Sequence, residues 1–196
     1  MHHLKSGIRI LGVDDAKFLP WKPNTTTPLI GVVYQGPYRI LGILQTDIAI
    51  DGTDATQKLL EMLDSSKFRS QIRLIMLHGS TFAGFNYIDA NHVFEVTKLP
   101  VIIVGDRKPD YVAIKHALLT HFEDGAERWT ILQKPGDLYE CESRIGIKPV
   151  YLQLAGIDFD SAKKIVQSSA VYSRIPEPIR IAHLIGSSFP HKSDEI

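Results

Sequence analysis

The order of apolar runs along the 196-residue chain constrains its fold most strongly. Three strand-like runs come first, and Gly36 and Pro37 join the second to the third, which is typical of an antiparallel hairpin. Strand-like runs then alternate with segments in which apolar residues recur every three or four positions, as in helices that cover a sheet. This order predicts a mixed α/β sheet, with three antiparallel strands first and parallel strands after them.

The pattern also predicts where the elements lie. Strands are expected at 8–13, 29–34, 38–50, 72–77, 100–104, 129–132 and 150–154, and helices from 55, at 85–99, from 110, at 158–169 and from 176. The segment 20–28 contains three prolines and is expected to form a loop outside the sheet. The succession matches the ribonuclease H-like architecture, in which right-handed crossovers place helices on both faces, although other mixed α/β sheets could give much of the same order. Because no repeat or interior linker divides the chain, we expect a single domain over 1–196 with a polar tail at about 191–196.

Composition excludes several classes of protein. Lys plus Arg and Asp plus Glu each number 22, so the chain lacks the basic excess of a non-specific nucleic-acid binder. One cysteine, Cys141, cannot form an intrachain disulfide or a thiolate zinc site. No stretch approaches the roughly 20 apolar residues that a membrane helix needs. We therefore expect a cytoplasmic protein that does not enter the membrane, in which any contact with DNA or RNA depends on a few residues.

Polar side chains follow strands that the predicted sheet places side by side. Asp14 ends the first strand, His78 and Gly79 end the fourth, and Asp51 follows the third. Since residues at the ends of neighbouring parallel strands meet at one edge of a sheet, Asp14, Asp51 and His78 are candidate metal ligands. Carboxylate oxygens suit Mg²⁺ or Mn²⁺, and such an ion would orient a water against a phosphodiester.

Each of these residues also has a purely structural interpretation. Asp51 and Asp54 suit a strand-to-helix turn with a capping residue, and Asp15 suits simple solvation at a strand end. His78 can ligate a metal, but its imidazole supplies no negative charge to balance Mg²⁺. Asp89 and His92 lie three residues apart, which fits either a ligand pair or an ordinary helix surface.

The last predicted helix presents a polar edge. Pro176 and Pro178 fix its first turn, and Arg180 and His183 lie close together on the side away from its apolar centre. We predict that Arg180 binds phosphate and that His183 acts as a general acid or base, the alternative being two solvated side chains. Gly79 opens a loop of small residues whose backbone N–H groups could bind an anion, and we predict a phosphate contact there.

Two segments carry a family resemblance. The segment 172–183 resembles the C-terminal signature of endonuclease V, and 12–14 resembles its first-strand motif. The chain from 9 to about 188 is similar to an uncharacterised, chiefly archaeal family related to that nuclease, with further matches at 51–56 and 84–89. The resemblance implies a ribonuclease H-like fold and, for the nuclease relatives, Mg²⁺-dependent cutting of nucleic acid near a deaminated base.

The resemblance carries over to only part of the nuclease site. Asp14 falls on the first-strand aspartate of endonuclease V, and His183 falls on a site position where that nuclease has His or Asp. Its second acid falls near Gly52 and its third on His78, while its strand-end lysine falls near Asp106. The resemblance therefore implies an incomplete set of metal ligands.

Three hypotheses follow. The first is a divalent-metal nuclease acting on DNA or RNA, with Asp14, Asp51 and His183 as catalytic residues. The second is a catalytically inactive descendant of the fold that binds nucleic acid or a protein, and the third is a hydrolase of small phosphorylated molecules. The strand-separating wedge of endonuclease V would fall on 42–45, where nothing comparable occurs, which argues against inspection of a deaminated base in a duplex.

Overall fold

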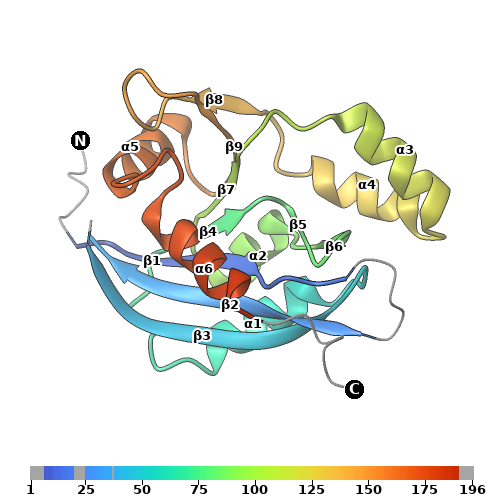
Figure 1. The fold of residues 1–196 in the computed structure, drawn as a ribbon, viewed down its shortest axis with the longest axis horizontal. Coiled ribbons are helices and arrows are strands. Elements are labelled where there is room, and N and C mark those ends of the chain that lie inside the picture. The colour runs from blue at the N-terminus through green and yellow to red at the C-terminus, as the bar shows by residue number, and fades with distance from the viewer. Residues whose placement is uncertain (1–6, 20–24, 37, 190–196) are drawn as a thin grey trace.

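A seven-stranded mixed sheet lies at the centre of the fold, with the strand order β3-β2-β1-β4-β7-β9-β8 (Figure 1). The computed structural model describes residues 7–19, 25–36 and 38–189. The predictions for Pro37, for 20–24 of the proline-rich segment and for the tail at 191–196 lie outside those residues. The strands are β1 (Arg9–Asp15), β2 (Thr26–Gln35), β3 (Arg39–Ala49), β4 (Leu74–His78), β7 (Val101–Gly105), β8 (Tyr139–Cys141) and β9 (Val150–Ala155).

The strand directions confirm the predicted order. β1, β2 and β3 are antiparallel neighbours, whereas β4 is parallel to β1 and β7 is parallel to β4. β9 lies antiparallel to β7, and the short β8, which the sequence pattern did not predict, lies antiparallel to β9. In the β1–β4 register Val13 pairs with Leu77, so the residues that follow them, Asp14 and His78, lie at adjacent strand ends.

Helices cover both faces of the sheet, as the sequence predicted. One face packs against α1 (Ala55–Asp64) and α2 (Ala90–Thr97), and the other packs against α5 (Phe159–Ser169) and α6 (Glu177–Ser187). Leu59 of α1 is fully buried in the first layer, and Ile165 of α5 and Ile179 of α6 are buried in the second. No helix in the described part of the chain is long and apolar enough to cross a membrane.

A helical hairpin of α3 (Tyr111–His121) and α4 (Gly125–Gln133) extends beyond the sheet (Figure 1). Arg128 of α4 is buried, and its Nη1 donates to the backbone carbonyls of Asp51, Gly52 and Phe85 at 2.9 to 3.0 Å. The guanidinium therefore joins this hairpin to the turn after β3 and to the loop that follows β4.

Three predictions about elements were wrong. Trp129–Leu132 lie in α4 and not in a strand, because the surrounding residues continue a helix and packing overrides the β propensity of a four-residue run. The helix predicted from Phe85 begins at Ala90, since β5 (Thr81–Phe82) and β6 (Asn86–Tyr87) form a small hairpin before it. The segment 26–28 pairs with β3, and the carbonyl of Pro28 still accepts from the N–H of Ala16 at 2.8 Å.

Candidate metal centre

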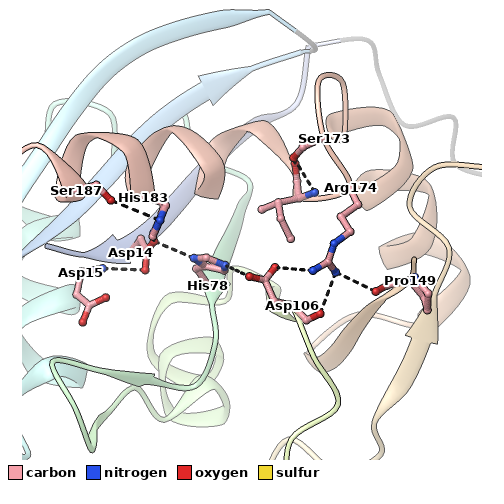
Figure 2. A network of polar contacts seen from close by, with 10 residues as sticks. Asp14, Asp15, His78, Asp106, Pro149, Ser173, Arg174, His183 and Ser187 are labelled. Atoms are coloured by element: carbon pink, nitrogen blue, oxygen red, sulfur yellow. Dashed lines mark hydrogen bonds and ion pairs between the residues drawn. The ribbon is translucent and has the colours of Figure 1, made fainter. Parts of the chain in front are cut away.

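Asp14, at the end of β1, lies between two histidines (Figure 2). Its side chain is buried, and its Oδ2 is 2.8 Å from Nδ1 of His78 and 2.8 Å from Nδ1 of His183. The other carboxylate oxygen accepts from the N–H of Asp15 at 3.0 Å. His78 reaches Asp14 from the adjacent end of β4, and His183 reaches it from α6, so residues 14, 78 and 183 meet at one edge of the sheet.

Two glycines allow α6 to approach β1 closely. A Cβ at Gly12 would lie 2.3 Å from the carbonyl carbon of Pro178, and a Cβ at Gly186 would lie 2.4 Å from the carbonyl oxygen of Asp15. Any other residue at either position would push the helix away from the strand. Because His183 lies on this helix, the close packing of β1 and α6 sets its distance from Asp14.

The three side chains offer a set of donors that fits one metal ion. One carboxylate oxygen and two imidazole nitrogens lie within 4.8 Å of one another. Two ligand atoms on opposite sides of a metal ion lie about 4.2 Å apart, so small side-chain rotations would bring all three into contact with it. The side chain of His183 is 57% exposed, whereas those of Asp14 and His78 are 5% and 17% exposed, so the centre opens to solvent beside α6.

A second layer of polar groups surrounds the histidines (Figure 2). Nε2 of His78 lies 3.8 Å from Oδ2 of Asp106, which follows β7. Arg174 contacts Asp106 in turn: its Nη2 is 3.6 Å from Oδ1, and its Nη1 donates to the carbonyls of Asp106 at 2.9 Å and Pro149 at 3.1 Å. On the opposite side, Nε2 of His183 lies 3.5 Å from the hydroxyl of Ser187.

Burial and charge act in opposite directions on His78. Burial lowers its pKa, but the hydrogen bond and charge of Asp14, together with the charges of Asp106 and Asp15, outweigh burial and raise the pKa above its ordinary value. A metal ion that binds at Nδ1 would therefore compete with a proton on the imidazole, which the neighbouring carboxylates stabilise.

Asp15 points away from the histidines and toward the loop after β4. Its carboxylate accepts from the N–H of Ala83. Burial, together with the nearby charge of Asp14, raises the pKa of Asp15 to about 6, although the hydrogen bond from Ala83 opposes the shift. The cluster around Asp14 does not include this carboxylate.

Asp51 and Asp54 shape the turn before α1. Asp51 has a left-handed backbone with φ of 54°, and its Oδ1 accepts from the N–H of Phe85 at 2.9 Å. Oδ1 of Asp54 accepts from the N–H of Ala49 at 3.1 Å and from the amide of Asn86 at 2.6 Å. Within the described residues the cluster around Asp14 contains neither, so the structure does not bring the predicted ligand Asp51 together with Asp14 and His78.

The two predicted phosphate contacts already have partners within the protein. Arg180 pairs with the buried Glu177, with Nη2 and Oε2 2.7 Å apart. The N–H of Gly79 donates to the carbonyl of Val104 at 3.0 Å. These partners hold both groups in place near the strand ends and the face of α6, and they must be shared or exchanged if either group binds phosphate.

Asp89 and His92 have a structural role. Oδ1 of Asp89 accepts from the backbone N–H of His92 at 3.0 Å and caps α2, while its Oδ2 pairs with Lys134 at 2.6 Å. Because it is the backbone of His92 that makes this contact, the spacing of the two residues reflects a helix N-terminus.

Sequence reasoning did not single out Asp106, Arg174 or Ser187. Asp106 directly follows β7, which pairs with β4. Its position after a strand end, like that of Gly79 after β4, was the signal that could have identified it. Arg174 lies inside the signature-like segment 172–183, in which only Arg180 and His183 attracted attention because of their helical spacing.

Comparison with known proteins gives consistent matches over nearly the whole chain. Residues 6–189 match the family described as endonuclease dU. A UPF0215 protein of Methanothermobacter thermautotrophicus is 44% identical over 94% of this chain and 88% of its own length. A UPF0215 protein of Pyrococcus furiosus is 39% identical over 96% of this chain and 95% of its own length.

Solved structures agree with these matches. A protein of unknown function from Archaeoglobus fulgidus is 38% identical with a TM-score of 0.79, over 91% of this chain and 96% of that chain. Endonuclease V of Ciona intestinalis, solved with DNA containing an inosine, has a TM-score of 0.60 at 16% identity, over 91% of this chain and 84% of that chain. The second similarity shows an endonuclease V-like fold. With the family match covering residues 6–189, the chain belongs to the endonuclease dU family, an uncharacterised archaeal family of endonuclease V-like fold.

Proposed function

We propose that this protein is a divalent-metal-dependent nuclease that acts on DNA or RNA. The observation that carries the proposal is the convergence of one carboxylate and two imidazoles within 4.8 Å, at adjacent ends of parallel strands. The site is open to solvent on the side of His183, so a large substrate can approach it.

Each group at the site would have a separate role in this reaction. Asp14, His78 and His183 would hold the ion, and the ion would supply Lewis-acid chemistry and an activated water to hydrolyse a phosphodiester. Asp14 contributes the negative charge of the ligand set, and Asp106 places a second negative charge behind His78. Arg180 lies three residues before His183 on α6, and we keep it as the candidate contact for a backbone phosphate. Asp51 would act indirectly, by fixing the loop that follows β4 through Phe85.

The description of the family and one structurally similar protein indicate which substrates to test first. The family is described as endonuclease dU, and the structurally similar Ciona endonuclease V was solved with inosine-containing DNA. Uracil and hypoxanthine are both products of base deamination, so deoxyuridine and deoxyinosine are the natural first substrates.

The test uses end-labelled single- and double-stranded oligonucleotides that carry one deoxyuridine or one deoxyinosine, and RNA that carries one inosine, with Mg²⁺ or Mn²⁺. We expect cutting that requires the ion and that Asp14→Ala and His183→Ala abolish. His92→Ala is the matched control, because the side chain of His92 is exposed on α2 and only its backbone N–H makes a described contact. Cutting that survives Asp14→Ala contradicts the proposal.

A second candidate function is binding without cutting. It is favoured by the single carboxylate in the cluster, since Asp51 and Asp54 are engaged by the turn before α1. Fluorescence anisotropy at low salt separates the two candidates: saturable oligonucleotide binding with no product under any ion would support the binding function. Release of phosphate from small phosphate esters, with oligonucleotides left intact, would instead support a small-molecule hydrolase.

A further inference from the structure

The two histidines of the cluster have the same orientation relative to Asp14. Each presents Nδ1 to the same carboxylate oxygen at 2.8 Å, and each turns Nε2 outward to another protein group. For His78 the outer group is the carboxylate of Asp106, and for His183 it is the hydroxyl of Ser187 (Figure 2). A histidine that ligates a metal usually has a polar partner at its outer nitrogen, which orients the ring with the other nitrogen toward the ion. Asp106, at 3.8 Å, and Ser187, at 3.5 Å, occupy these outer positions.

Asp106 is itself held in position. Arg174 reaches it twice, with Nη2 beside Oδ1 at 3.6 Å and with Nη1 donating to the Asp106 carbonyl at 2.9 Å. Oδ1 of Asp106 is buried and has no hydrogen-bond partner among the described residues, so its compensation comes from the charge of Arg174. The second oxygen, Oδ2, is the one that faces Nε2 of His78. A carboxylate fixed behind an imidazole increases the basicity of the nitrogen that faces a metal.

The chemistry of the donors distinguishes between ions. Mg²⁺ takes oxygen ligands and is held through carboxylates or phosphates with several retained waters. Two of the three donors here are imidazole nitrogens, which suit ions of the first transition series, and two histidines with one carboxylate leave coordination positions open for water and substrate. With one formal negative charge among its ligands, the cluster compensates little of the charge of Mg²⁺.

We infer that Asp14, His78 and His183 form a centre for a divalent ion of the first transition series and not for Mg²⁺, and that Asp106 positions His78 as a ligand. The inference rests on the proposed function, because it names the ion and a positioning residue of the same site. It concerns ion binding, which can be measured without substrate.

The ion class is tested by isothermal titration of the metal-free protein with Mn²⁺, Co²⁺ and Mg²⁺. We expect one saturable site for Mn²⁺, tighter binding of Co²⁺, and no saturation by Mg²⁺ in the same concentration range. The site is located by Asp14→Ala, which should remove the Mn²⁺ binding. Mg²⁺ binding as tight as that of Mn²⁺ overturns the inference on the ion while leaving a metal-dependent nuclease possible.

The role of Asp106 is tested in the same titration. Asp106→Ala should weaken Mn²⁺ binding by about 10- to 100-fold, which is the usual cost of removing the outer partner of a ligating histidine. Asp106→Asn should weaken it less, because the amide keeps a polar oxygen beside Nε2 and loses only the charge. Asp64→Ala removes an acid that is 66% exposed at the end of α1, and it serves as the matched control with unchanged affinity.

Each outcome has a separate meaning. Unchanged Mn²⁺ affinity in Asp106→Ala overturns the positioning role while the cluster stands. Failure of the wild-type protein to bind any of the three ions overturns both this inference and the proposed function. Mn²⁺ binding that Asp14→Ala leaves unchanged likewise overturns both, because the ion then lies elsewhere. Thermal unfolding of the metal-free variants shows whether each is folded, and Asp106→Asn preserves the test if the alanine variant is not.

Discussion

At the scale of single residues, two adjacent carboxylates have different environments. Asp14 faces two imidazoles and supplies the carboxylate of the candidate metal cluster. Asp15 points the other way, toward Ala83, where burial and the charge of Asp14 raise its pKa to about 6. Consecutive residues of a strand point to opposite sides, so a one-residue step along β1 separates a carboxylate of the candidate cluster from a carboxyl whose pKa is raised.

The raised pKa of Asp15 predicts how stability depends on pH in the metal-free protein. The folded protein binds this proton more tightly than the unfolded chain, so the free energy of unfolding should fall as pH rises from about 4 to about 6 and stay lower above that range. Asp15→Asn removes the ionisation and keeps an oxygen for the N–H of Ala83. We expect the variant to be more stable than wild type at pH 7.5, by on the order of 2 kcal/mol, and the difference to vanish near pH 4.

Urea unfolding at pH 4, 6 and 7.5 measures this difference. Asp64→Asn, at an exposed position of α1, is the control and should show no comparable dependence on pH. A difference between Asp15→Asn and wild type that stays the same at all three pH values would contradict the assigned cause.

How far a residue's role could be predicted depended on where its contacts come from. Asp14 and His78 followed from strand ends, whereas His183 followed from helical spacing and a family resemblance and was predicted to be a general acid or base. The structure brings these three together. Asp51 also follows a strand, yet its carboxylate accepts from the N–H of Phe85 in a loop arrangement that no spacing rule specifies. The contact of Asp106 with His78 became visible only when β4 and β7 were placed side by side, because it joins the last residue of one strand to the residue after the other.

At the scale of elements, the contact between β1 and α6 determines the site. The strand carries Asp14, the helix carries His183, and Gly12 lies where the two backbones come closest. The helix begins at Glu177 after Pro176, as the proline pattern predicted, and its apolar face packs on the sheet. The geometry of the cluster therefore depends on a residue that has no side chain.

This contact predicts the effect of Gly12→Ala. The added Cβ would lie 2.3 Å from the backbone of Pro178, so the helix must move away from the strand. We expect a loss of about 3 kcal/mol or more of stability from overpacking, and weaker Mn²⁺ binding because His183 moves with the helix. Chemical unfolding and Mn²⁺ titration measure the two effects.

Gly105→Ala is the matched stability control for Gly12→Ala. Its added Cβ would meet its nearest neighbour, the carbonyl oxygen of Arg107, at 3.4 Å, which is an ordinary contact. Equal stability losses in the two glycine variants would contradict this explanation, because they would show that the close approach of α6 to β1 is not the reason why Gly12 is needed.

The elements that sequence patterns misassigned are short or joined to distant parts of the chain. Trp129–Leu132 carries β-prone side chains, but it lies within a helix anchored by Arg128, whose Nη1 donates to residues more than forty positions away. β8 is three residues long and pairs with β9, so its strand conformation depends on its partner. The long periodic segments, by contrast, indicated their own structure and their place on the sheet.

At the scale of the whole molecule, the fold brings three distant positions to one edge of the sheet. His78 lies 64 positions and His183 lies 169 positions after Asp14 along the chain. The three residues meet because β4 is the neighbour of β1 in the sheet and α6 packs over β1. Formal charges balance at 22 against 22, so the chain has no general basic excess, and under the proposed function recognition of a polyanion would rest on this edge.

A crystal of the protein soaked in Mn²⁺ and measured at the manganese absorption edge tests the central claim most directly. We expect one anomalous peak within about 2.5 Å of the Asp14 carboxylate and of Nδ1 of both His78 and His183. The absence of a peak at Asp14 in a crystal whose other sites take up Mn²⁺, or a peak that contacts neither histidine, would contradict the metal centre and the function proposed for it.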